Sequence, residues 1–125
     1  MAFITDNAFD SGLSYLTTNG ETIYICSAEP TTYTEASSTN KLGTKTSATV
    51  GSPTSGATNG RRVIVSAITD GTVDTTGNAT HWALCKDSAT SELLATGALT
   101  GGPISVTGGN TFTLDAISIT IADAV

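Results

Sequence analysis

The segment that decides the fold is residues 111–122, which reads Thr-Phe-Thr-Leu-Asp-Ala-Ile-Ser-Ile-Thr-Ile-Ala. Apolar side chains alternate along it as in a β-strand, but Phe112 and Leu114 fall on even positions, whereas the isoleucines of 117–121 fall on odd ones. A strand keeps one parity for each face, so the phase changes near Asp115-Ala116. A β-bulge or a strand that crosses between two sheets causes such a change. The segment therefore predicts a corner of the kind found in β-sandwiches and jelly rolls.

Upstream of this corner, short apolar runs rich in β-branched and aromatic residues alternate with turn residues, which predicts further strands. The runs are Glu21–Ala28, Arg61–Ile68, Ala79–Lys86, Glu92–Leu99 and the short Ile104–Val106. Asp70-Gly71 has the composition of a tight turn. The polar stretch 87–91 predicts a hairpin between the runs on either side of it.

Two of these runs carry more detail. The run Glu21–Ala28 is apolar on both faces, which predicts a strand inside a sheet or one with a face covered by the helix. In Ala79–Lys86, alternation places Trp82 and Leu84 on one face. The opposite face then carries His81, Ala83 and Cys85.

Near the N-terminus the period changes to that of a helix. Phe9, Leu13 and Leu16 recur at spacings of four and three, which lines one helical face. Thr5 or Asp6 supplies an N-cap, and Asn19-Gly20 is a stop signal. We therefore predict a single all-β domain over residues 1–125: an antiparallel β-sandwich, jelly-roll-like, with one short N-terminal α-helix within residues 1–20.

Residues 29–60 differ in composition, because they are rich in Ser, Thr and Gly and have few apolar anchors. A connection of this length without structure is uncommon inside a compact domain. We expect one weak strand within Leu42–Val50, with Thr44, Thr46 and Ala48 on one side, between two mobile loops.

Composition excludes several classes of partner. The formal net charge is −6, and only Arg61 and Arg62 of the five basic residues are adjacent. Binding to nucleic acid or to an anionic membrane needs several basic residues on one face, so neither is expected. About three residues in ten are Ser or Thr, which leaves an uncharged polar surface on the strands. Residues 1–6 have no basic region and no long apolar core, so no signal peptide is expected.

Side chains suited to catalysis or metal binding are few and scattered. His81 is the single histidine, in mid-strand, and no Gly-x-Ser-x-Gly motif is present. Cys26 and Cys85 each lie inside an apolar run, which favours two buried thiols over a disulfide or a zinc site. Asp70, Asp74 and Asn78 have calcium-ligand chemistry but lack the EF-hand pattern, so ordinary turns are the better interpretation. No pattern selects a pair of carboxylates for glycoside hydrolysis. We predict no enzymatic activity, metal or cofactor.

Several stretches together resemble small proteins encoded among the virion structural genes of tailed bacteriophages and related prophages. They are Ile25–Tyr33, Gly60–Val63, Ala79–Leu84, Leu93–Leu99 and Asn110–Leu114, in the same order along most of the chain. The nearest functional class is the capsid cement or decoration protein, which binds the outside of the phage head. The resemblance carries no catalytic motif.

The resemblance implies a virion location on the capsid surface, after synthesis in the cytoplasm of the host bacterium. It also implies the major capsid protein as partner and a homotrimer, which would match a three-fold position of the lattice. Alternative roles are a tail, neck or fibre-base protein, or a host-surface carbohydrate-binding module, because a fold does not decide function.

Two segments are candidates for contact with the capsid. The first is the N-terminal segment, and the second is the long polar region, since tyrosine is favoured at interfaces and a long ordered loop needs a role. The residues expected to make these contacts are Phe3, Ile4, Phe9, Tyr33, Lys41, Leu42 and Lys45.

Overall fold

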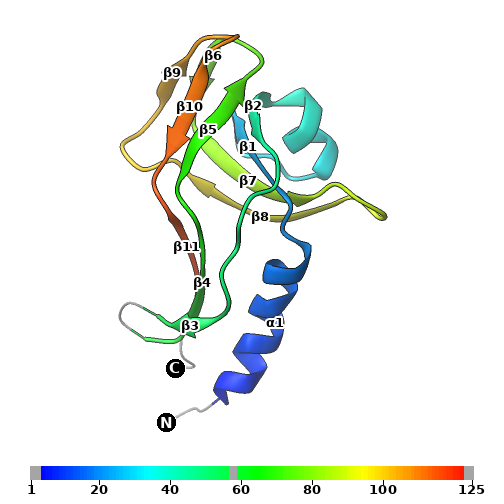
Figure 1. Ribbon diagram of the computed structural model, residues 1–125, viewed down its shortest axis with the longest axis vertical. Helices are drawn as coiled ribbons and strands as arrows, with labels where there is room; N and C mark the ends of the chain where they lie inside the picture. The colour runs from blue at the N-terminus through cyan, green and yellow to red at the C-terminus, as the bar shows by residue number, and fades with distance from the viewer. Residues whose placement is uncertain (1–3, 57–58, 123–125) are drawn as a thin grey trace.

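The computed structural model describes residues 4–56 and 59–122, and it consists mostly of antiparallel β-strands with one N-terminal helix (Figure 1). This architecture is consistent with a β-sandwich. In chain order the elements are α1 (Asp6–Asn19), β1 (Thr22–Cys26), the π-helical turn η1 (Glu35–Thr39), β2 (Lys41–Lys45), β3 (Thr54–Ser55), β4 (Arg61–Val65), β5 (Ile68–Val73), β6 (Gly77–Ala79), β7 (His81–Lys86), β8 (Glu92–Ala98), β9 (Ile104–Val106), β10 (Thr111–Leu114) and β11 (Ile117–Ile121).

The predicted helix is confirmed as α1. Phe9 and Leu13 are buried on one face, and Leu16 packs against the core. The helix ends at Asn19, and the N–H of Gly20 donates to the Leu16 carbonyl at 2.7 Å. Gly20 has no left-handed backbone, but a Cβ on it would lie 2.7 Å from that same carbonyl oxygen. Close packing therefore explains the glycine at the end of the helix.

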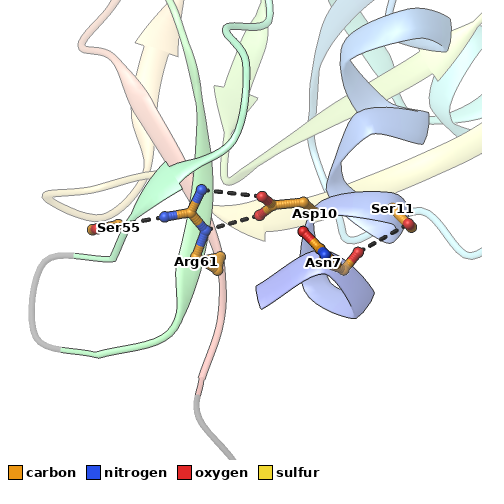
Figure 2. A network of polar contacts seen from close by, with 5 residues as sticks. All are labelled: Asn7, Asp10, Ser11, Ser55 and Arg61. Carbon is orange, nitrogen blue, oxygen red and sulfur yellow. Dashed lines mark hydrogen bonds and ion pairs between the residues drawn. The ribbon is translucent and has the colours of Figure 1, made fainter. Parts of the chain in front are cut away.

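A charged contact fixes α1 to the strands beside it (Figure 2). The Arg61 guanidinium of β4 donates from Nε to Asp10 Oδ1 at 2.8 Å and from Nη2 to Asp10 Oδ2 at 3.1 Å. Its Nη1 also reaches Ser55 Oγ of β3 at 3.4 Å. Planar guanidinium and carboxylate groups match in this two-point geometry, so the pair sets the orientation of the helix on the sheet.

The strands form one large sheet and two small ones, all antiparallel. The large sheet has the order β10-β5-β2-β1-β7-β8, the second has the order β11-β4-β3, and β6 pairs with β9. All residues of β1 are buried, as its doubly apolar sequence predicts. One of its faces belongs to the main core, and the other is covered by the segment around η1 rather than by α1.

The corner predicted at Asp115-Ala116 is confirmed. β10 pairs with β5 in the large sheet, whereas β11 pairs with β4 in the second sheet, so the chain changes sheets between Leu114 and Ile117. Figure 1 shows β10 continuing downward into β11 beside the similar passage between β5 and β4. The side-chain alternation therefore changes phase at Asp115-Ala116 because the chain passes from one sheet to the other there.

Two predictions for this part of the chain are wrong. Arg61–Ile68 is not one strand, because the chain leaves β4 after Val65 and enters the other sheet at Ile68. Asp70-Gly71 is not a turn, because β5 runs straight through both residues. A Cβ on Gly71 would lie 2.3 Å from ring carbons of Phe112, so this glycine makes room for a ring on the neighbouring strand.

The region 29–60 contains more structure than one strand. It supplies η1, β2 and the two-residue β3, and Val50 adds a single bridge to Val65. The predicted weak strand exists as β2 but begins at Lys41 and ends at Lys45. Ser47 has a positive φ of 55°, which turns the chain away from the extended path.

Cys26 and Cys85 are both buried free thiols, as the sequence predicts. They lie on the outer face of the large sheet, in a small apolar cluster with Tyr24, Ala36 and Ala83. Burial raises the pKa of Cys26 to about 11. Burial, followed by the nearby Asp87 carboxylate, raises the pKa of Cys85 to about 12.

These thiols should therefore be unreactive in the folded protein. We expect a disulfide-exchange reagent at pH 8 to modify neither thiol faster than the chain unfolds, because the thiolate is the nucleophile and neither sulfur is accessible. In denaturant both should react at once. The Cys26→Ala and Cys85→Ala variants each keep one cysteine, and the measurement is the rate at which the reagent modifies it. Fast modification of the remaining cysteine in either variant without denaturant contradicts the prediction.

Candidate functional site

A groove of about 500 Å³ lies where the end of β8 approaches the corner between β10 and β11. Trp82 and the segments 97–104 and 113–118 build it, and its apolar lining comes mainly from Trp82, Leu99, Ile104, Leu114 and Ile117. Its size is within the range of pockets that hold small ligands or partner side chains. The corner is thus both a feature of the fold and one wall of the groove.

Trp82 and Gly97 are paired across β7 and β8 within this groove. A Cβ on Gly97 would lie 2.7 Å from indole Cζ2 of Trp82, so the strand can cross the ring only with glycine at this position. The indole is itself only 8% exposed. Ile104 lies nearby with 39% of its surface exposed, so an apolar side chain remains open to a partner.

The wall formed by the corner is acidic. Asp115 is the one charged residue among the described residues that line the groove, and it is exposed. No basic side chain lines the described part of the groove, and Arg62 of β4 reaches its wall by donating from Nη1 to the Ser118 hydroxyl at 3.3 Å. A groove that combines apolar side chains with polar ones and a carboxylate suits a ligand that has apolar groups next to polar groups and a cation.

The contact residues predicted in the N-terminal segment separate into three cases. Phe3 lies outside the described residues. Ile4 is 47% exposed just before α1 and is available to a partner. Phe9 is buried in the folded chain, so it packs inside the protein and does not present its ring at the surface.

The residues predicted in the polar region are held within the chain. Leu42 is buried in the main core. Lys41 pairs with Asp74 at 3.4 Å, and Lys45 pairs with Asp70 at 3.0 Å. These two aspartates therefore serve as partners of lysines on β2.

Tyr33 is tied to a shared carboxylate on the outer face of the large sheet. Its hydroxyl donates to Asp87 Oδ1 at 2.8 Å, and the Tyr24 hydroxyl donates to the same oxygen at 3.0 Å. The Thr22 hydroxyl donates to Asp87 Oδ2. Burial, followed by the bond to Asp87, raises the pKa of Tyr24 well above its usual value. This cluster fastens the segment before η1 across 54 residues of sequence and leaves none of the hydroxyls free to react.

The Glu21 carboxylate holds the turn that follows β7. Its Oε1 accepts the backbone N–H groups of Asp87 at 2.7 Å and Ser88 at 2.8 Å, and its Oε2 accepts the Ser88 hydroxyl. The Ser88 hydroxyl bond is the largest cause that lowers the pKa of Glu21, followed by the two backbone bonds.

This arrangement predicts a pH dependence of stability. Because the pKa of Glu21 is lowered by folding, its contribution is complete above the ordinary glutamate value and is lost as the pH falls through the lower, folded value. The Glu21→Gln variant should therefore show a shallower fall in unfolding free energy than the wild type as the pH falls below the ordinary glutamate pKa of about 4.3. Urea titrations at several pH values measure this slope. Glu29→Gln, an exposed glutamate without these bonds, is the control, and equal slopes for Glu21→Gln and the wild type contradict the assignment.

The arrangement around His81 is that of a surface residue. Its Nδ1 lies 2.9 Å from the Thr80 hydroxyl, and its Nε2 lies 3.8 Å from Glu29. Within residues 4–56 and 59–122, no group of three or more His, Cys, Asp or Glu side chains has the arrangement of a metal site. In the same part of the chain, no helix has both the length and the apolar character needed to cross a membrane.

Sequence reasoning did not identify the groove, although it pointed to part of it. The change of phase at Asp115-Ala116 marks the corner that forms one wall. The other walls depend on which strands pair, which the sequence does not specify. Comparison with protein-family models, curated proteins and solved structures finds no match for this chain.

Proposed function

We propose that this chain is a structural virion protein of a tailed bacteriophage, a cement or decoration protein that binds the outer surface of the head and stabilises the lattice of the major capsid protein. The proposed role is non-enzymatic and needs no cofactor. It includes a jelly-roll-like sandwich and a homotrimer at a three-fold position of the capsid, where symmetry multiplies weak contacts.

The observation that carries the proposal is the coincidence of the groove with the stretches that resemble virion proteins. Trp82, residues 97–99 and residues 113–114 all line the groove, and each lies in one of those stretches. The groove is partly apolar, exposed at Ile104 and acidic at Asp115, which fits a surface that holds another protein. Exposed Ile4 is a second point of contact in the proposal.

The direct test uses expanded capsids that lack this protein. Labelled wild-type protein should bind them, and capsids without it should release DNA at a lower temperature on heating. The Asp115→Lys variant should bind about tenfold more weakly, because it reverses the charge on the groove wall. Glu29→Lys is the matched control: it makes the same change of charge beside His81, on the face of β7 opposite to Trp82. Recovery of the protein only from isolated tails would contradict the capsid role and favour a tail or neck position.

A further inference from the structure

One wall of the groove belongs to a strand with a free edge. β8 pairs with β7 on one side and is the last strand of the large sheet on the other. The Leu99 N–H donates to the Thr80 carbonyl at 2.9 Å. Hydrogen-bonded and non-bonded pairs alternate in an antiparallel ladder, so Gly97 also faces β7, whereas the N–H and C=O groups of Thr96 and Ala98 point outward.

This free edge has one device that hinders pairing, a break in register at Leu94, because Leu84 pairs with Ala95 and Cys85 pairs with Leu93. Edge strands are commonly short or carry lysine, proline or an inward-pointing charge. β8 has seven residues, and its one charge is Glu92 at the start, where the carboxylate accepts the Tyr15 hydroxyl at 2.6 Å. The following residues are half-buried and uncharged as far as Gly97. The regular part of the edge, from Ala95 to Ala98, can therefore accept another strand.

The groove lies directly beside this edge. A strand added to β8 would extend the face of the sheet that carries Trp82, and its side chains on that face would enter the groove towards Leu114 and Ile117. Residues of opposite parity would face away from the groove, towards solvent. A free strand edge and a groove in one place are the two elements of strand addition, in which backbone bonds provide affinity and side-chain pockets provide specificity.

Charge distinguishes between the possible occupants. A second copy would bring another net charge of −6 to an edge that already has Asp115 beside it. Three of the basic side chains that a second copy would bring, Lys41, Lys45 and Arg61, are engaged with aspartates within their own chain. A fourth, Arg62, donates to Ser118 of its own chain at 3.3 Å. A foreign segment with a basic residue meets no such repulsion.

We propose that the groove binds an extended segment of another protein as a seventh strand on β8, with alternate apolar side chains in the groove and a lysine or arginine against Asp115. The inference rests on the proposed use of the groove as a partner-binding site, and it adds the chemistry of the partner and the manner of binding.

A synthetic peptide tests the inference with the intact protein. The probe is acetyl-Lys-Val-Thr-Val-Thr-Val-Lys-amide, which has a lysine at each end so that either strand direction brings one to Asp115. We expect the peptide to slow amide exchange at Thr96 and Ala98 at least tenfold while leaving Gly97 unchanged, since Gly97 already pairs with β7. Asp115→Lys should weaken binding about tenfold, whereas Glu29→Lys should not.

Removal of backbone N–H groups from the peptide tests the main-chain hydrogen bonds directly, and it leaves the folding of the protein unaffected. One peptide is N-methylated at its valines and another at its threonines. In an added strand, only every second residue points its N–H towards the neighbouring strand. Methylation should therefore abolish the binding of one of these peptides and leave the binding of the other unchanged. Equal effects of the two methylations, or no protection of Thr96 and Ala98 at a saturating peptide concentration, overturn the inference. Protection of both amides without peptide, together with a dimer in sedimentation, assigns the edge to a second copy and also overturns it.

The two proposals fail in different ways. If capsids bind the protein but the peptide leaves the β8 edge unprotected, the capsid role stands and strand addition is wrong. If the peptide binds as described but capsids do not bind the protein, the manner of binding stands and the virion role is wrong.

Discussion

Replacing Leu84 by alanine should lower the free energy of unfolding by about 3–5 kcal/mol, the range typical of a fully buried leucine. Leu84 is 0% exposed in the centre of the main core. On β7 it lies opposite Ile23 of β1 and Ala95 of β8, so its side chain belongs to the middle of the large sheet. Neighbours held by two ladders cannot collapse into the space left, and the cavity therefore persists.

The matched control is Leu94→Ala on β8, which makes the same chemical change at a partly buried position. An edge strand can relax towards a deleted side chain, so this variant should lose about 1 kcal/mol, little more than the transfer of the removed atoms. Urea denaturation measures both values, with an unchanged slope as the sign of two-state unfolding. Equal losses at the two positions would mean that β7 is not the rigid centre of the sheet.

Local patterns were sufficient to predict the helix, the β7–β8 hairpin and the corner. At Asp115-Ala116 the change of phase predicted either a β-bulge or a strand that passes to another sheet. The structure shows the passage between sheets, since β10 and β11 have pairing partners in different sheets. Each successful prediction depended on information within one short segment.

The failures depended on contacts between distant segments. Gly71 has the local composition of a turn after Asp70, but its absent side chain accommodates the ring of Phe112, which lies 41 positions further along the chain. Lys41 and Lys45 looked available to a partner, but they are engaged by Asp74, which directly follows β5, and by Asp70 on β5. The groove is the extreme case, because its lining comes from strands whose order in the sheet no local pattern specifies.

Replacing Asp87 by alanine should be the most damaging polar substitution, with an expected loss of about 3–5 kcal/mol. Its carboxylate accepts the hydroxyls of Thr22, Tyr24 and Tyr33. Thr22 is 2% exposed and Tyr24 is 7% exposed, so both hydroxyls would remain buried without an acceptor. An unpaired buried hydroxyl costs about 1–3 kcal/mol, which is why the effect exceeds that of one lost hydrogen bond.

Tyr33→Phe is the matched control, since it removes one donor and leaves the carboxylate with two others. We expect a loss of about 1 kcal/mol, close to the net value of a single hydrogen bond. Amide exchange distinguishes this account from general destabilisation. In Asp87→Ala, residues 31–40 should exchange faster than the rest of the chain, because the cluster fastens that segment to the outer face of the sheet.

The groove and the Asp87 cluster lie on opposite faces of β7 and β8. The Asp87→Ala variant therefore also tests whether the two faces of the sheet are independent. At temperatures where Asp87→Ala is still folded, its affinity for the peptide strand should equal that of the wild type, since Trp82 and the free edge of β8 are unchanged. Reduced affinity together with faster exchange in residues 31–40 would instead mean that the two faces of the sheet are coupled. In that case the segment that covers the outer face would also control access to the edge.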